Sequence, residues 1–357
     1  MAPGKLYLRP TQFVDTPVGH ADGSVARLAG GMQWFGAYEV IAVDGGGRSS
    51  THIPLAQFAP TDPRLIQLHA AIIAPRPALM LGERTLRLDQ PLVAGILNVT
   101  PDSFSDGGTH QDDPAAAADA GVGMAAAGAA LVDIGGESTR PGAPAVWVDD
   151  EIKRVVPVIE RLARAGVTVS IDTRKPEVMA AALTAGAGIV NDVAALLWDD
   201  RAVQVVADAG CPVVLMHSPD PKQGGHGRTT YADVLTEVYD WLENRIAAVV
   251  AAGVERSKIL VDPGIGFGKS LADNLALING LSLFHGLGCP ILLGVSRKRM
   301  IGALSNEAPV TERLGGSIAL ALKGAELGAQ LLRVHDVTDT VQAVKVWRGL
   351  RDRAVVG

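Results

Sequence analysis

Residues 129–142 read Ala129-Ala-Leu-Val-Asp-Ile-Gly-Gly-Glu-Ser-Thr-Arg-Pro-Gly142. The apolar first part is short enough for a buried strand, and the two glycines that follow it end the strand. Thr139 and Arg140 therefore fall on the loop that leaves the carboxyl end of this strand. Arginine can donate two parallel hydrogen bonds to phosphate oxygens, and threonine adds a hydroxyl group, so the loop is suited to bind an anion. A single turn of this kind is more often an ordinary loop than a binding site. The interpretation as a binding site is strengthened because similar polar residues follow the other expected strands of the chain.

The same pattern recurs from Pro91 onward, where apolar runs alternate with alanine-rich helical segments eight times. The expected strands are 92–97, 129–134, 167–171, 188–190, 212–216, 258–261, 290–295 and 330–334. The expected helices are 114–128, 149–165, 176–185, 200–209, 232–252, 273–287, 311–327 and 338–351. Buried parallel strands read as continuous apolar runs, and eight strand-helix units in about 260 residues is the size of a (β/α)8 TIM barrel. An open doubly wound α/β sheet is the alternative.

The first 78 residues have a different pattern. Short β-like runs at 6–8 and 38–43 alternate with turn clusters, and one helical candidate covers 64–73. A hairpin with Gly82-Glu83 as its turn is expected at 78–88. We find no catalytic constellation here, and we interpret residues 1–78 as an accessory extension of mixed α/β character or an oligomer contact. The barrel domain is expected at residues 79–357.

Composition restricts the classes of function. The chain has 357 residues, of which 48% are hydrophobic and 20% are charged, as in an ordinary globular protein. No stretch approaches the roughly 20 apolar residues that a membrane span needs, and residues 1–10 lack the apolar core of a secretory signal. With Cys211 and Cys289 interpreted as buried thiols in a reducing compartment, we expect a cytoplasmic protein. The net charge of −6 argues against a nucleic-acid surface.

Polar residues follow every expected strand. Active sites of (β/α)8 barrels lie at the carboxyl ends of the strands, so these residues are expected to share one rim. In strand order they are Asn98 with 100–108; Asp133, Glu137, Thr139 and Arg140; Asp172; Asn191 and Asp192; Met216 and His217; Asp262 with 263–269; Ser296 to Arg299; and Arg333, His335 and Asp336.

Seven motifs give this rim a family resemblance. They are 95–108, 133–142, 170–173, 191–192, 262–269, 296–298 and 333–336, in order and each after an expected strand. Over about residues 79–353 the chain resembles the dihydropteroate synthases of the folate pathway. The resemblance implies a (β/α)8 barrel enzyme. Its reaction joins 6-hydroxymethyl-7,8-dihydropterin diphosphate to p-aminobenzoate by an SN1-like mechanism, and it releases diphosphate.

A pterin presents several N–H donors along one edge, so a dry pocket needs carboxylates to accept them and an amide that can both donate and accept. Asp172, Asp262 and Asn191 meet that requirement. By resemblance Lys298 donates to a ring atom and Arg333 stacks on the ring. The substrate-binding residues expected for the pterin are therefore Asp172, Asn191, Met216, Asp262, Lys298 and Arg333.

Breaking the bond to diphosphate leaves a cation-like methylene carbon, and the leaving anion has to be neutralised where it forms. By resemblance Asn98 is the Mg2+ ligand, while Thr139, Arg140 and His335 hold phosphate oxygens. Mg2+ is bound largely through substrate phosphates, so one protein ligand can suffice.

The second substrate needs positioning more than activation, because its arylamine is neutral near pH 7. By resemblance Pro141, Phe267 and Ser296 shape the p-aminobenzoate pocket. Both expected partners are small molecules, and the family commonly forms homodimers through helices on the side of the barrel. The stretch Met216-His-Ser-Pro-Asp220 departs from the family pattern Met-His-Met-x-Gly, and His217 is interpreted as structural or as part of the pocket rim.

Two other functions are compatible with parts of this pattern. A pterin-binding barrel that transfers a methyl group to a corrinoid protein would share the acids, but it has no use for a diphosphate clamp. A catalytically silent paralogue that binds pterin usually lacks loop residues, and none of the motif residues is missing here.

Overall fold

The structure is a computed structural model that describes residues 4–45, 47–100, 113–138, 145–223, 227 and 229–356. Its centre is a ring of eight parallel strands in the order β12-β11-β10-β9-β8-β7-β14-β13. A parallel bridge between Val261 and Ile291 connects the two ends of this order. The sheet is therefore a nearly closed (β/α)8 barrel, as the periodicity predicts, and the open-sheet alternative is wrong. The strands are β7 (Leu92–Asn98), β8 (Leu131–Gly135), β9 (Val169–Asp172), β10 (Ile189–Asp192), β11 (Val213–Met216), β12 (Ile259–Asp262), β13 (Leu292–Gly294) and β14 (Leu331–Val334).

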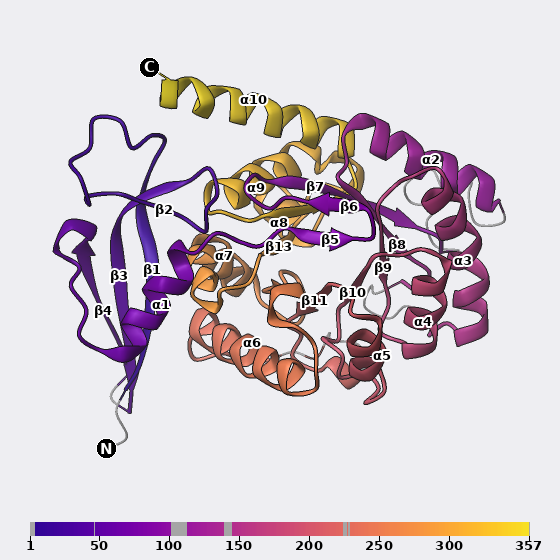
Figure 1. Ribbon diagram of the computed structural model, residues 1–357, viewed down its shortest axis with the longest axis horizontal. Helices are drawn as coiled ribbons and strands as arrows, with labels where there is room; N and C mark the ends of the chain where they lie inside the picture. Colours follow the sequence, from indigo (N-terminus) through magenta and orange to yellow (C-terminus); the bar gives the residue numbers. More distant parts are fainter. Residues whose placement is uncertain are drawn as a thin grey trace.

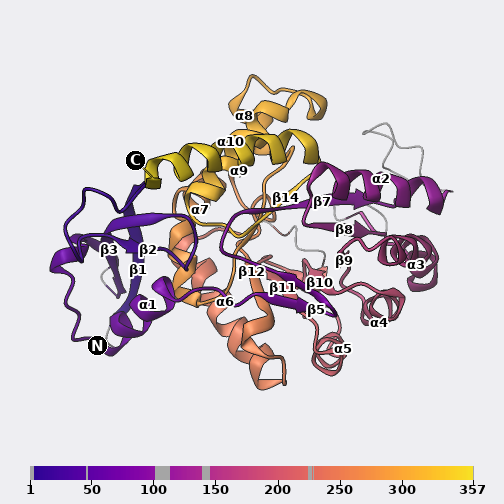
Figure 2. The same ribbon diagram turned by 45° about the horizontal axis from the view of Figure 1, so that its top comes forward.

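Helices surround the barrel (Figure 1, Figure 2). They are α2 (Pro114–Ala127), α3 (Val148–Arg164), α4 (Pro176–Ala185), α5 (Ala202–Ala209), α6 (Val234–Ala251), α7 (Leu271–Asn279), α9 (Leu314–Glu326) and α10 (Val337–Val356), with a short α8 (Arg299–Leu304) after β13. The helix predicted at 273–287 is wrong in its second half. It ends at Asn279, and a 3-10 helix, η5 (Leu281–Leu287), follows. In the described part of the chain, no helix combines the length and the apolar character needed to cross a membrane.

The amino-terminal region forms its own antiparallel sheet beside the barrel (Figure 1). β3 (Trp34–Asp44) is the central strand. It pairs with β1 (Lys5–Val14) on one side and with β2 (Ala26–Arg27) and β4 (Gly47–Pro54) on the other. A short η1 (Leu55–Gln57) leads to α1 (Pro63–Ile73), whose first turn is capped by the Asp62 carboxylate. The mixed α/β character predicted for this region is confirmed.

This region packs on the flank of the barrel formed by α6 and η5. The ring of Tyr7 meets that of Tyr239 edge-on, with 5.5 Å between centroids, and its hydroxyl donates to Asp240 at 2.8 Å. The Ser282 hydroxyl donates to the Pro10 carbonyl oxygen at 2.9 Å. The buried residues of both parts belong to one hydrophobic cluster. The accessory sheet and the barrel therefore share a core.

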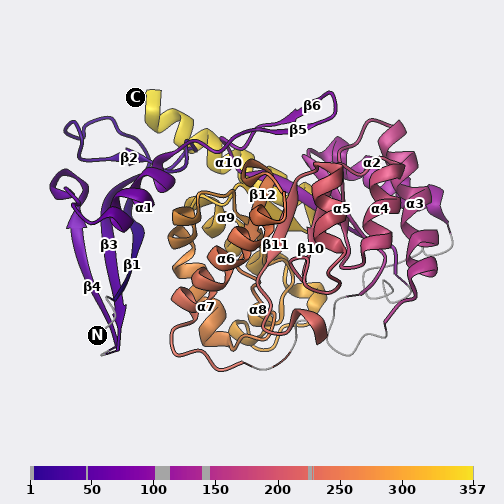
Figure 3. The same cartoon turned by 60° about the horizontal axis from the view of Figure 1, so that its bottom comes forward.

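The hairpin of β5 (Leu79–Leu81) and β6 (Arg84–Leu86) closes the amino-terminal end of the barrel. Leu79 and Leu88 are buried against the inward-facing residues at the starts of the strands, which are Ala94, Leu131, Ile189, Val214, Leu260, Leu292 and Leu331. Figure 3 shows the hairpin at the opposite end of the barrel from α8, which follows the carboxyl end of β13. The apolar plug leaves the carboxyl-terminal end as the place for polar chemistry.

Candidate active site

A cavity of about 1100 Å3 lies at the carboxyl-terminal end of the barrel. Every predicted site residue that the structure describes lines it: Asn98, Asp172, Asn191, Met216, Asp262, Phe267, Ser296, Lys298, Arg333 and His335. Thr139, Arg140 and Pro141, like most of the 100–108 loop, lie outside the described residues. Short parallel strands bring side chains from distant parts of the sequence to this rim, because each strand ends at the same level.

Arg333, on β14, joins two aspartates from neighbouring strands. Its Nε donates to Asp133 Oδ2 at 2.5 Å, and its Nη2 donates to Asp172 Oδ2 at 2.6 Å. Asn191 Nδ2 also donates to Asp133 Oδ2, at 2.9 Å. Asp133 was placed on the rim by the sequence pattern but was not assigned to the pocket, and its inward position on β8 is the signal that could have identified it.

Two carboxylate oxygens of this cluster have no hydrogen-bond donor within the described residues. Asp133 Oδ1 and Asp172 Oδ1 are both buried. A buried acceptor without a donor costs free energy that a ligand N–H group can recover. Of these two aspartates, Asp172 lines the cavity, so its carboxylate is the acceptor that fits a ligand with N–H donors.

Burial changes the ionisation of the charged groups around the cavity. It raises the pKa of Asp172 to about 7, although the Arg333 guanidinium acts in the opposite direction. It also raises the pKa of Asp262, partly offset by Lys298. Burial lowers the pKa of Lys298 to about 8, against the effect of Asp262. Acids whose pKa is raised and a base whose pKa is lowered, together in one cavity, are typical of a functional site.

The turn after β12 forms one wall of the cavity. Lys298 Nζ donates to the Ile265 carbonyl oxygen and lies 4.9 Å from the centroid of the Phe267 ring. Asp262 Oδ1 accepts from the Gly264 amide at 2.7 Å. Gly264 has a φ of +70°, and a Cβ there would overlap the carbonyl oxygen of His217. Only glycine fits this position without strain.

The glycine-rich segment 264–268 binds a lysine instead of cradling phosphate. Lys269 Nζ donates to the Gly264 carbonyl oxygen at 2.8 Å and to that of Phe267 at 3.2 Å, and lies 2.9 Å from His217 Nδ1. His217 is 4% exposed, and burial lowers its pKa to about 2, so the ring is neutral. Its ring also meets that of Trp241 edge-on. These contacts support the structural interpretation of His217.

Asn98 at the end of β7 and His335 after β14 also line the cavity. His335 Nδ1 lies 3.0 Å from the Ser296 hydroxyl, which also accepts from the His335 amide at 3.2 Å. Ser296, expected in the p-aminobenzoate pocket, therefore contacts a residue expected to hold phosphate. The described residues contain no group of three or more His, Cys, Asp or Glu side chains that could hold a metal ion.

This fold and cavity define a (β/α)8 barrel enzyme for a small polar ligand that is rich in hydrogen-bond donors. Residues 94–335 match the family model described as "Pterin binding enzyme", which covers more than half of the chain. The chain therefore belongs to the pterin-binding enzyme family.

Several similar proteins are named dihydropteroate synthase. The chain is 47% identical over 263 residues to the dihydropteroate synthase of Escherichia coli strain K12, covering 73% of this chain and 92% of that protein. A Xanthomonas albilineans dihydropteroate synthase structure with 4-aminobenzoic acid is 51% identical, with a TM-score of 0.72, covering 77% of this chain and 98% of that one. The enzyme of the same organism in complex with 7,8-dihydropteroate is 48% identical, with a TM-score of 0.69 and coverage of 77% and 99%. The resemblance predicted from the motifs is confirmed.

Proposed function

We propose that this protein is a dihydropteroate synthase, a transferase. It condenses 6-hydroxymethyl-7,8-dihydropterin diphosphate with p-aminobenzoate to give 7,8-dihydropteroate and diphosphate. The observation that carries the proposal is the meeting, in one cavity, of all ten described residues that the sequence analysis assigns to the site. Relatives of known structure were solved with 4-aminobenzoic acid and with 7,8-dihydropteroate, which supports p-aminobenzoate as a substrate and 7,8-dihydropteroate as the product here.

The acid cluster binds the pterin. Asp172 lines the cavity, its Oδ1 has no donor in the described chain, and its carboxylate accepts N–H groups of the amino-pyrimidinone edge. Asn191 and Asp262 complete the edge recognition, and Lys298 donates to a ring oxygen or nitrogen. Arg333 stacks on the ring with the flat face of its guanidinium, while its in-plane N–H groups stay on Asp133 and Asp172.

The reaction then separates the two halves of the substrate. The C–O bond to diphosphate breaks, both electrons stay on the leaving oxygen, and the methylene carbon becomes cation-like by conjugation with the pterin. The amine of p-aminobenzoate attacks that carbon, and its extra proton passes to water. Thr139, Arg140 and His335 stabilise the leaving diphosphate. Pro141, Phe267 and Ser296 hold the aminobenzoate so that its nitrogen faces the carbon.

Mg2+ fits this cavity as an ion carried mainly by the diphosphate. Asn98 offers a single amide oxygen at the phosphate end, and Mg2+ binds through one or two protein ligands plus substrate phosphates. When bound, it neutralises charge on the leaving group. We expect Asn98→Ala to raise the Mg2+ concentration needed for half-maximal turnover.

Turnover with substrate omissions tests the activity. The purified protein, Mg2+ and the pterin diphosphate are incubated with and without p-aminobenzoate, alongside Arg140→Ala. Coupled release of diphosphate and dihydropteroate, lost in the variant, is the expected result. Tight pterin binding without turnover would support the silent paralogue. Methyl transfer from methyltetrahydrofolate to a corrinoid protein would support the methyltransferase alternative.

The protein also forms a homodimer in this proposal. Val346 and Leu350 lie one turn apart on α10 and are 61% and 71% exposed. The flank formed by α6 and η5 is already covered by the accessory sheet, so α10 offers the apolar surface to a second copy. Sedimentation should give a dimer for the natural chain and a monomer for Leu350→Glu. If the natural chain and Leu350→Glu both sediment as dimers, the assignment of this surface is contradicted.

Residues 1–78 and 79–357 are proposed as two structural units of a cytoplasmic protein that binds small molecules only. Cys211 and Cys289 are buried and unpaired, as expected in a reducing compartment. Recovery of the protein in the cytoplasmic fraction of the source cells is the test of its location.

A further inference from the structure

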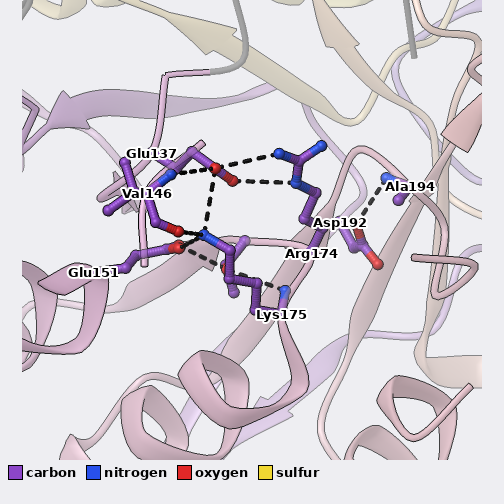
Figure 4. Close-up of polar contacts among 8 residues, drawn as sticks. Glu137, Val146, Glu151, Arg174, Lys175, Asp192 and Ala194 are labelled. Carbon is purple, nitrogen blue, oxygen red and sulfur yellow. Dashed lines mark hydrogen bonds and ion pairs between the residues drawn. The ribbon is translucent and has the colours of Figure 1, made fainter. Parts of the chain in front are cut away.

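The glycine-rich turn after β12, residues 263–269, ends in a lysine that the proposed reaction does not use. Lys269 lines the cavity. A lysine inside a protein is usually paired with a carboxylate, as at Lys175, whose Nζ lies 2.5 Å from Glu151 and 3.3 Å from Glu137 (Figure 4). Within the described chain, the hydrogen-bond partners of Lys269 are uncharged instead. Its place in the turn therefore needs an explanation other than an ion pair.

The Lys269 ammonium group binds the backbone of its own turn and the end of a neighbouring strand. Its Nζ donates to the Gly264 carbonyl oxygen at 2.8 Å and to the Phe267 carbonyl oxygen at 3.2 Å. It also lies 2.9 Å from Nδ1 and 3.5 Å from the carbonyl oxygen of His217, which follows β11. An ammonium group has three N–H donors, and these acceptors are enough to satisfy all of them. One side chain therefore connects the start of the turn, Phe267 and the end of β11.

Asn274, on α7, attaches the same turn to the helix that follows it. This residue is 5% exposed and also lines the cavity. Its Oδ1 accepts from the Gly266 amide at 2.6 Å, and its Nδ2 donates to the carbonyl oxygens of Lys269 at 3.2 Å and Ser270 at 2.7 Å. Asn274 therefore contacts the backbone before and after Phe267.

Other side chains fix the first half of the turn. Asp262 Oδ1 accepts from the Gly264 amide at 2.7 Å, and Lys298 Nζ donates to the Ile265 carbonyl oxygen. These are the acid and the base proposed to bind the pterin. Lys298 Nζ also lies 4.9 Å from the centroid of the Phe267 ring, which restrains the ring but not the backbone that carries it. The backbone of the second half is bound by the two side chains described above.

The backbone around Phe267 needs such contacts because glycines flank it. Gly266 and Gly268 have φ of +86° and +59°, and glycine has more accessible conformations than any other residue. Within the turn, the Phe267 amide donates to the Gly264 carbonyl oxygen at 3.2 Å, which is at the long end of the usual range. The side-chain contacts therefore help to select one conformation of the turn.

Burying the ammonium group has a cost. Burial lowers the pKa of Lys269 to about 7, although Asp262 acts in the opposite direction. A charged group that loses water without an opposite charge in contact is a poor source of stability. A role in fixing the turn explains the lysine better than a contribution to stability does.

We propose that Lys269 and Asn274 are positioning residues for p-aminobenzoate, because they fix the backbone that places the Phe267 ring in its pocket. The inference rests on the proposed function. Phe267 lines the cavity and is one of the residues assigned to p-aminobenzoate. When the ring is displaced, the amine no longer faces the methylene carbon, so its attack slows. Recognition of the pterin is unaffected, because Asp262 and Lys298 keep their own contacts.

Two measurements separate the two substrates. We measure kcat/KM for p-aminobenzoate at saturating pterin diphosphate and Mg2+, and calorimetry gives the dissociation constant of the pterin diphosphate with Mg2+. In Lys269→Met we expect kcat/KM to fall about tenfold or more, with the dissociation constant changed by less than about twofold. Lys153→Met is the matched control, because Lys153 lies on α3 with its side chain 76% exposed. It should change neither quantity.

Variants of Asn274 make the test independent of the buried charge. Asn274→Leu removes the contact with the Gly266 amide, and it should show the same selective fall in kcat/KM. Asn274→Asp keeps an oxygen for that amide, so it should retain more of the rate than Asn274→Leu. Thermal unfolding establishes that each variant is folded, and the Asn274 variants provide the test if Lys269→Met does not fold.

A double variant tests whether Lys269 acts through Phe267. Phe267→Leu by itself should lower kcat/KM for p-aminobenzoate. Adding Lys269→Met to Phe267→Leu should cause little further fall, since the ring that Lys269 positions is already absent. Falls that multiply would show that Lys269 acts on the substrate independently of the ring, and this result would overturn the inference.

Two other results would also overturn the inference. One is an unchanged kcat/KM for p-aminobenzoate in folded Lys269→Met and Asn274→Leu variants. The other is an equal loss of affinity for the pterin diphosphate, which would indicate general disruption of the cavity. A natural protein that forms no dihydropteroate would instead contradict the proposed function, and the inference would fail with it.

Discussion

At the scale of single residues, Asp172 connects the chemistry of the cavity to pH. Because burial raises its pKa to about 7, the carboxylate is lost as the pH falls below that value. We predict that pterin affinity decreases by up to about tenfold for each pH unit below about 7. Calorimetric titrations on either side of that pH measure the effect. Asp172→Asn should bind weakly at every pH, and an unchanged pH profile in this variant would assign the titration to another group.

The same residue makes stability change in the opposite direction. An aspartate in the unfolded chain titrates near pH 4, roughly its usual value, so the folded chain holds this proton more tightly. The stabilising contribution of Asp172 is fully present below about pH 4 and is lost as the pH rises through about 7. The difference in unfolding free energy between the natural chain and Asp172→Asn should therefore shift in favour of the variant as the pH rises.

Arg333 holds two buried carboxylates, and its removal leaves both without their cation. Arg333→Met should lower the free energy of unfolding by about 3–5 kcal/mol. Adding Asp133→Asn removes one of the uncompensated charges, so the double variant should be more stable than Arg333→Met alone. Urea denaturation of the three proteins measures this order. A double variant that is less stable would show that the charges do not act as one cluster.

Most members of this site could be predicted from the sequence, because each lies directly after an apolar run. The hydrogen bonds and ion pairs among these residues could not be predicted from the sequence. Arg333 contacts Asp133 and Asp172 across 200 and 161 positions of sequence separation. The buried ion pair of Lys175 with Glu151 could not be predicted either, because Lys175 precedes a helix and Glu151 lies within one, where charged side chains are usually exposed. Burial, which decides their role, is a property of the assembled barrel.

At the scale of elements, the turn after β12 depends on a glycine. In Gly264→Ala, the added Cβ would overlap the His217 carbonyl oxygen at a residue with positive φ. This oxygen belongs to the backbone, so it cannot move away without a shift of the main chain. We predict a loss of about 1–3 kcal/mol or more in unfolding free energy and a higher KM for both substrates. Gly315→Ala, in α9 with no atom within 4 Å of the added Cβ, is the control. It should stabilise the protein by about 0.5–1 kcal/mol, and equal effects in the two variants would refute the argument.

The segment η5 shows where the prediction of secondary structure from the sequence fails. The apolar pattern of 273–287 is continuous, so it predicts one helix, but the helix ends before Gly280. A Cβ at Gly280 would lie 2.6 Å from the Leu235 side chain, which shows how closely this segment approaches α6. Such a close approach between helices is a tertiary constraint that local periodicity does not report.

At the scale of the whole molecule, the shared core predicts one cooperative unit. Leu68, on α1, is 2% exposed and packs beside Gly286 of η5. Leu68→Ala should lower the free energy of unfolding by about 2–5 kcal/mol and shift a single calorimetric transition. Ile66→Ala, at a half-exposed position of the same helix, should have little effect. Two resolved transitions would mean that the accessory sheet unfolds independently of the barrel.

The barrel itself was predictable because its eight units repeat one local pattern. The placement of the accessory sheet was not, because it depends on contacts such as that of Arg351 on α10 with Asp15, 2.7 Å apart. Such pairings carry no periodic signal.

The central claim is that this cavity binds the pterin substrate and catalyses its condensation with p-aminobenzoate. The most direct measurement is turnover of the natural chain, of Asp262→Asn and of Asp119→Asn, a control on the exposed face of α2. We expect equal amounts of dihydropteroate and diphosphate from the natural chain and from the control. In Asp262→Asn we expect a loss of about tenfold or more in kcat/KM at an unchanged melting temperature. Full activity in a folded Asp262→Asn variant would contradict it.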